Sequence, residues 1–155
     1  MAVVLENLVA GGAELGAIFL EARQDSEIAL IEQRTALINQ LQQAIREYYP
    51  TAREAFEDWT SPSTWAFVES FPTPAALEKA GRRRQEKFLH VHRLWRPETA
   101  ARRMEVFARA GAFTGSAPAI AAKSLLAVSL ARVLRTLEQQ IEIYRQRIEK
   151  VFAQH

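Results

Sequence analysis

The sequence predicts an all-α fold in which two long helices form a coiled-coil hairpin and bracket a cluster of short helices. Apolar residues recur at helical spacing over most of the chain, and residues that cap helices precede several prolines. The chain has no Asn-Gly or Asp-Gly pair and no sustained alternation typical of strands. We expect a poorly defined segment at 1–23 and a helical coiled-coil domain at 24–155, with a basic helical subdomain inserted at about 51–115.

The first long helix is expected to run from Asp25 or Ser26 to Tyr49. Both starting residues are of types that cap helices, and Pro50 prevents simple continuation. The apolar face of this helix is broad enough to pack on two neighbours. It consists of Ile28, Ile31, Ile38 and Ile45 at heptad spacing, with Leu30, Leu37, Leu41 and Tyr48 beside them.

Short helices follow, each with its own start signal. Thr51 and Glu54 have the spacing of a capping box. The pairs Ser61-Pro62 and Thr73-Pro74 each place a capping residue before a proline, and Arg96-Pro97 begins a helix that should end near Gly111. A local aromatic core is predicted from Trp59, Trp65, Phe67 and Phe71. This interpretation is favoured over a base-stacking platform, which needs more exposure and more arginines nearby.

The last helix should begin near Pro118 and continue to Phe152. Its apolar residues follow strict 4-3 spacing, which predicts left-handed coiled-coil packing. The seam comprises Leu130, Leu134, Leu137, Ile141, Tyr144, Ile148 and Val151. It could pair with the first long helix, with a second copy of the chain, or with both. Because the first helix is expected to be shorter, we predict that part of this seam serves a homo-oligomer.

Charge is strongly segregated along the chain. Residues 1–78 carry four Arg against twelve Asp and Glu, a net charge of −8, whereas residues 79–109 carry ten Lys and Arg against three Glu, a net of +7. Such asymmetry indicates an anionic partner for the middle segment, or its docking on an acidic neighbour. A helix at 74–80, then Gly81, then a helix at 82–93 also has the pattern of a helix-turn-helix.

We therefore predict that the basic segment contacts DNA, and structured RNA as well, through phosphates rather than base edges. The candidate residues are Arg82, Arg83, Arg84, Lys87, His90, His92, Arg93, Arg96, Arg102 and Arg103. His90, His92 and Trp95 could stack on splayed RNA bases. The alternatives are a solvated basic face, or docking on the chain's own acidic half.

Other chemistry is not expected. The absence of cysteine excludes disulfides, Cys-ligated zinc, iron–sulfur clusters and a thiol nucleophile. His90 and His92 would point in different directions, and Glu54 and Asp58, at i and i+4, are interpreted as solubility charges rather than a Mg²⁺ site. No nucleophile–base pair or phosphate loop is present. We predict no catalytic residue, metal, cofactor, small-molecule substrate or membrane partner, and a cytoplasmic location.

Seven separated stretches of the sequence, in order, resemble one known family. They are RTALINQLQQAIREYYP at 34–50, WAFVESFPTP at 65–74, KFLH at 87–90, RPETA at 96–100, FARA at 107–110, AKSLL at 122–126 and VFAQH at 151–155. Residues 33–155 resemble the central region of DEDD-type insertion-sequence transposases, the family of Piv-like DNA invertases and bridge-RNA-guided recombinases. About four-fifths of the chain is covered.

The resemblance implies a part of a larger machine. Members of that family combine a RuvC-like domain that carries four acidic metal ligands, a helical coiled-coil middle and a C-terminal domain with a serine nucleophile. This chain resembles the middle alone, so no catalytic residue is carried over and no enzyme activity is expected of it. The expected function is oligomer assembly and nucleic-acid contact in DNA transposition. The alternative is a free-standing helical DNA-binding or partner-capture protein derived from such a gene.

Overall fold

The computed structural model describes residues 12–154, and within them the chain is all-α with no strand. This confirms the all-α part of the predicted fold class. The helices are α2 (Gly12–Tyr48), α3 (Pro50–Ala55), α4 (Pro62–Ser70), α5 (Pro74–Val91), α6 (Pro97–Ala108) and α7 (Ala117–Gln154), with a 3₁₀ turn, η1, at Ala110–Ala112.

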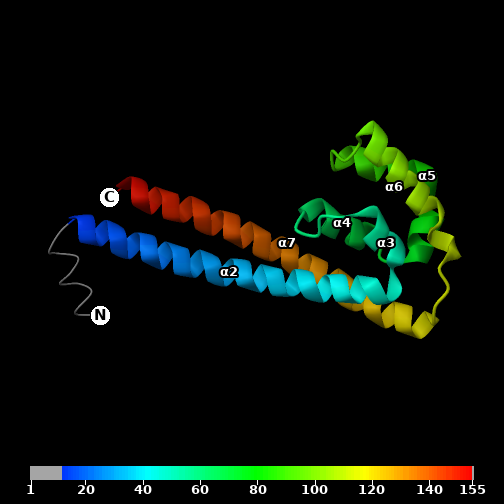
Figure 1. Ribbon diagram of the computed structural model, residues 1–155, viewed down its shortest axis with the longest axis horizontal. Coiled ribbons are helices and arrows are strands. Elements are labelled where there is room, and N and C mark those ends of the chain that lie inside the picture. Colours follow the sequence, from blue (N-terminus) through cyan, green and yellow to red (C-terminus); the bar gives the residue numbers. More distant parts are fainter. Residues whose placement is uncertain (1–11, 155) are drawn as a thin grey trace.

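The two long helices, α2 and α7, lie side by side and antiparallel, and the short helices gather at one end of the pair (Figure 1). Ion pairs link the long helices: Arg34 to Glu138 at 2.8 Å, and Arg145 to Glu27 at 3.2 Å. The molecule therefore consists of an arm of two helices and a compact head. The arm's far end carries both chain ends that the structure describes.

The start of α2 differs from the sequence prediction. The helix begins at Gly12 rather than at Asp25 or Ser26, and residues 1–11 lie outside the described part of the chain. Contacts with the end of α7 explain the difference. The Tyr144 hydroxyl donates to the carbonyl of Arg23 at 3.4 Å, and the Arg23 guanidinium lies 5.8 Å from the ring centre of Phe152. Tertiary packing thus sustains a helix through two residues that locally favour a cap.

The heptad seam of α7 is used within the chain. Leu130, Leu134 and Ile141 are buried, and Leu137, Tyr144, Ile148 and Val151 are half-buried. The premise that a shorter first helix would leave part of the seam uncovered is wrong, because α2 has 37 residues and α7 has 38. Larger exposed apolar side chains of α7 lie off the seam, at Leu125, Leu126, Val133 and Ile143.

The core of the head is built around Phe67 of α4. Its ring stacks on Phe107 of α6, with centroids 5.4 Å apart, and lies 4.7 Å from Phe56 and 5.7 Å from Phe88 of α5. The predicted aromatic residues Trp59, Trp65, Phe67 and Phe71 are all buried. Both indole N–H groups donate to backbone carbonyls, Trp65 to Trp59 and Trp59 to Phe56. The structural interpretation of this cluster is confirmed.

Local start signals succeeded where a capping residue preceded proline. The Ser61 side chain accepts a hydrogen bond from the Ser63 amide, and Thr73 accepts one from the Ala76 amide. The predicted capping box is wrong, because α3 already begins at Pro50 and Thr51 is buried inside it. Proline at the first helical position fixed the start instead.

Among residues 12–154 one helix, α7, contains an 18-residue stretch that is long and apolar enough by composition to cross a membrane. Only 28% of that stretch is buried. Core helices of soluble proteins meet the same criterion, and Ala127, Ala131 and Leu134 of α7 are fully buried in the head. The stretch is thus a weak indication of a membrane span, and the absence of a membrane partner remains a prediction.

Candidate nucleic-acid interface

Gly81 bends α5 into two segments, at the position where the sequence predicted a break. Its dihedral angles, φ 79° and ψ 167°, are non-helical. Residues with a Cβ rarely adopt such a φ, so glycine permits the kink. The second segment carries the run of basic residues from Arg82 onward, and Gln85 anchors it by donating to the carbonyl of Leu77 at 2.9 Å.

The basic residues of this second segment point outward. Arg83, Arg84 and Lys87 are exposed, and none has a hydrogen bond or ion pair with another residue of the described chain. Arg82 is also exposed but pairs with Glu86 at 2.9 Å, one turn along the same helix. Three cations of α5 are therefore free to meet an external anion.

The aromatic candidates are already engaged inside the chain. His90 and Trp95 stack on each other with centroids 4.4 Å apart, while His92 packs against Phe88 at 4.2 Å. Burial lowers the pKa of His92, and the positive charge of Arg135 on α7 lowers it further. The two histidines occupy separate environments. Trp95 alone of the three tryptophans keeps substantial exposure, at 38%.

Two of the ten candidate residues hold the fold together. Arg102 donates to the carbonyl of Glu54 at 3.1 Å, and Arg103 donates to that of Ala55 at 3.0 Å. These carbonyls belong to the last turn of α3, where a cation satisfies oxygens that have no donor within the helix. Part of α6 therefore docks on the acidic half of the chain, which is one of the alternatives that the sequence left open.

The acidic residues of the first half find their counter-charges elsewhere than on α5. Glu54 pairs with Arg109 at 2.8 Å, Glu47 with Lys123, and Glu69 with Arg132 and Arg135. Arg109 was not among the predicted site residues, because the predicted interface ends at Arg103. Because Arg109 and α7 supply these partners, no acidic residue of the described chain forms an ion pair with the free cations of α5.

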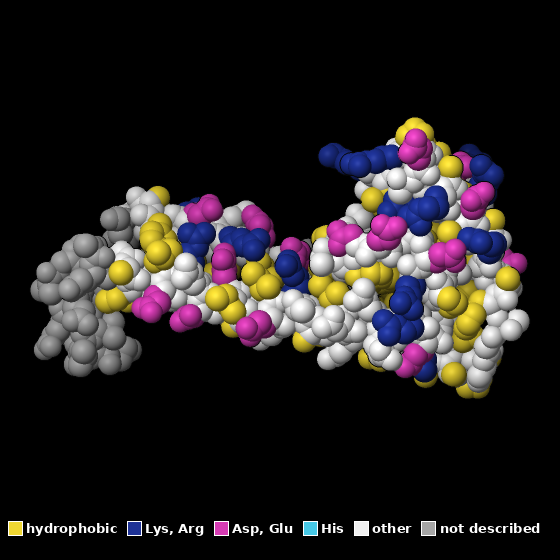
Figure 2. All heavy atoms as spheres, viewed as in Figure 1, with side chains coloured by type: hydrophobic (Ala, Val, Ile, Leu, Met, Phe, Trp, Pro, Cys, Tyr) yellow, Lys and Arg dark blue, Asp and Glu magenta, His cyan; other side chains and the backbone are white. Residues whose placement is uncertain are grey.

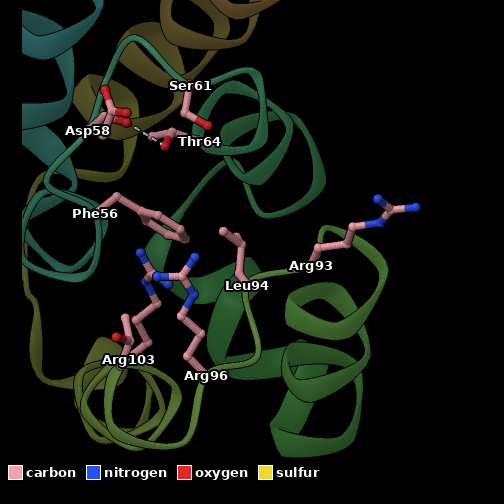
Figure 3. A pocket seen from close by; sticks show the side chains of 9 residues that line it. Phe56, Asp58, Ser61, Thr64, Arg93, Leu94, Arg96 and Arg103 are labelled. Atoms are coloured by element: carbon pink, nitrogen blue, oxygen red, sulfur yellow. Dashed lines mark hydrogen bonds between the residues drawn. The ribbon is translucent and has the colours of Figure 1, made fainter.

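The last two candidates, Arg93 and Arg96, follow α5 in the connection to α6. Arg93 has a positive φ of 57°, and its side chain points away from the neighbouring cavity in Figure 3. Arg96 points inward, as does Arg103, and both line a cavity of about 250 Å³ between α6 and the α3–α4 connection. Neither Arg93 nor Arg96 has a side-chain partner in the described chain.

The head presents basic and acidic side chains together rather than one unbroken basic sheet. In the view of Figure 2, patches of Lys and Arg over the head are separated by Asp and Glu.

The ten candidate residues divide into two groups. Half of them are engaged in contacts within the chain. The other half are free cations between positions 83 and 96, namely Arg83, Arg84, Lys87, Arg93 and Arg96. We call the five free residues the basic face.

The carboxylates considered for Mg²⁺ do not share a helical face. Helix α3 ends at Ala55, so Asp58 lies in the following connection and accepts from the Thr60 amide at 2.9 Å. Among residues 12–154 no group of three or more His, Cys, Asp or Glu is placed to hold a metal ion.

Comparisons with protein-family models, with curated proteins and with solved structures give no match to this chain.

Proposed function

We propose that this chain is a non-catalytic helical module of a transposase or site-specific recombinase, which contacts nucleic acid and holds the protein parts of such an assembly in place. The observation that carries the proposal is the basic face, where five cations between Arg83 and Arg96 have no partner in the described chain. Unpaired guanidinium and ammonium groups neutralise phosphates and release counterions, so DNA is the expected ligand and structured RNA a second one.

The arm fits the assembly role in this proposal. Helices of 37 and 38 residues span roughly 55 Å each at 1.5 Å per residue. The heptad spacing of the α7 seam, together with its burial, favours antiparallel coiled-coil packing with α2. Such an arm sets the distance between a nucleic-acid-binding head and whatever adjoins its far end. Self-association remains part of the proposal, through surfaces other than the buried seam positions.

The proposal includes no DNA chemistry by this chain. In the family that the sequence resembles, the metal-binding acids and the serine nucleophile lie outside the matching region. Purified protein is expected neither to nick nor to join DNA with Mg²⁺ present. Metal-dependent cleavage that persists through several independent purification steps would contradict this part of the proposal.

The second candidate is a free-standing helical DNA-binding or partner-capture protein. The mixed charge of the head favours it, because acidic side chains lie among the basic ones there (Figure 2), and such a surface suits a partner that is only locally anionic. The two candidates share the basic face and differ in their partners. Affinity for a RuvC-like domain or a serine-nucleophile domain of such a recombinase, added as a separate protein, would favour the first.

Hydrogen exchange tests the proposed interface directly. Protein with and without duplex DNA is compared at low salt, and the same comparison is made with a structured RNA. We expect added protection in the second segment of α5 and in the connection to α6, and none in the arm. Failure of both nucleic acids to bind at low salt would refute the proposal.

A further inference from the structure

The cavity beside the basic face is lined by two arginines whose positions suit an anion. Two of its lining side chains, Arg96 and Arg103, direct their guanidinium groups toward Phe56 from the same side in Figure 3. The Arg103 side chain is fixed, because its Nε donates to the Ala55 carbonyl at 3.0 Å and its guanidinium lies 4.9 Å from the Phe56 ring centre. One cation is thus held in position and a second stands free beside the same space.

Hydrogen-bond donors complete this wall of the cavity. Helix α6 begins there at Pro97, and its N-cap, Arg96, makes no side-chain cap. The amide and hydroxyl of Thr99, in the first turn, have no hydrogen bond in the described chain, and Thr99 lines the cavity. First-turn amides and the positive end of the helix dipole favour an anion. The start of α6 therefore adds a hydrogen-bond donor beside Arg96 and Arg103.

The one carboxylate that lines the cavity, that of Asp58, forms no ion pair with these arginines in the described chain. Asp58 lies on the opposite wall, where its Oδ1 accepts from the amide and the hydroxyl of Thr60. No ion pair joins Asp58 to an arginine of the described chain. Burial lowers the pKa of Arg103, the charge of Arg102 adds to this, and Glu57 opposes it. An anionic ligand would add a favourable charge interaction with the partly buried guanidinium of Arg103.

We propose that the cavity between α6 and the α3–α4 connection binds a phosphate group, held by Arg96, Arg103 and the Thr99 amide. Planar guanidinium groups with several N–H donors match the spacing of phosphate oxygens, each of which accepts hydrogen bonds. That the phosphate belongs to a nucleic-acid backbone rests on the proposed function. A free phosphate ion shares the same chemistry and is separated from it by the experiment.

The test compares Arg96→Gln with Arg147→Gln. Arg96 has no side-chain partner in the described chain, so its loss removes charge from the cavity without breaking a contact of the fold. Arg147 is likewise exposed and unpaired there but lies on the distal half of α7, so it makes a control with the same charge change. Inorganic phosphate is titrated against chloride at equal ionic strength, with the Thr99 amide signal followed by NMR. Binding of a short duplex DNA is measured for each protein.

We expect phosphate to shift the Thr99 amide in the wild type and in Arg147→Gln, with at least a tenfold weaker response in Arg96→Gln. Duplex affinity should fall several-fold in Arg96→Gln, with a salt slope shallower by about one. A phosphate response without that duplex effect would uphold the site and assign it to a free anion. If Arg96→Gln matches Arg147→Gln in both measurements, the inference of a phosphate site is overturned. The proposed function would still stand in that case if duplex binding depends on Arg83, Arg84 and Lys87.

Discussion

The indole ring of Trp95 stacks on the imidazole ring of His90, with centroids 4.4 Å apart and the ring planes inclined by 19°. The stack covers one face of the indole and leaves the side chain 38% exposed. His90 and Trp95, which were predicted to stack on bases, therefore stack on each other within the chain. At most the outer face of Trp95 is open to a base, beside the cations of the basic face.

This stack makes Trp95 a reporter of the interface. Trp59 and Trp65 are 4% and 0% exposed, so iodide should quench only the fluorescence of Trp95. We expect Trp95→Phe to remove nearly all quenchable emission, and saturating structured RNA to shield Trp95 in the wild type. If RNA binds and iodide quenching is unchanged, the bound nucleic acid lies away from this ring.

The arm predicts a contrast between two isoleucines of α7. Ile141 is 1% exposed and Ile143 is 39% exposed. Replacing Ile141 by Ala should lower the free energy of unfolding by about 2–5 kcal/mol, because loss of a buried side chain leaves a cavity. Ile143→Ala should cost distinctly less. Chemical denaturation followed by circular dichroism measures both. Equal losses of unfolding free energy in the two variants would show that α7 does not bury the Ile141 face against α2. Sedimentation of the same two variants reports whether either residue also supports self-association.

Two glycines predict opposite responses to alanine. Gly81 has a φ of 79°, and an alanine there should lower the free energy of unfolding by about 1–3 kcal/mol through backbone strain. Gly16 lies in α2 with open space where a Cβ would stand, so alanine there should stabilise the helix by about 0.5–1 kcal/mol. Thermal unfolding of both variants provides the comparison. A Gly81→Ala protein as stable as wild type would argue against the kink in α5.

The lowered pKa of His92 predicts a pH-dependent stability. Its ordinary pKa is 6.5, so between that value and the lower folded-state pKa the unfolded chain binds a proton that the folded chain does not. The free energy of unfolding should therefore decrease as the pH falls from about 7 through this window. His92→Gln should remove that component of the pH dependence. An NMR titration of His92 with a midpoint above 6.5 would reverse the sign and contradict the burial of this ring.

Local signals in the sequence were enough for the parts of the fold that local chemistry decides. Ser61 and Thr73 cap the helices they precede, Pro50 ends the first long helix, and Gly81 breaks α5. The extension of α2 to Gly12 was not predictable in this way, because contacts with the end of α7 decide it. Spacing within a sequence carries no record of such long-range contacts.

The candidate site shows the same division. Composition located the basic segment, and the exposure of Arg83 and Arg84 agrees with an interface there. It could not separate these residues from Arg102 and Arg103, whose donors satisfy carbonyls of α3 that lie 48 residues away in sequence. Nor could it show the cavity, since Arg96 and Arg103 meet only once α6 packs beside the α3–α4 connection.

The salt dependence of duplex binding tests most directly whether the basic face binds phosphates of nucleic acid. The variant Arg83→Gln, Arg84→Gln, Lys87→Gln is compared with Arg46→Gln, Arg147→Gln, Lys150→Gln, which removes three exposed cations of the arm that are unpaired in the described chain. If about four charges meet phosphates, log affinity of the wild type should fall with log salt at a slope of roughly −3 to −4. The basic-face variant should bind more weakly than the wild type, with a slope of about −1. The arm variant should match the wild type. Equal slopes for the two triple variants would contradict phosphate binding by the basic face.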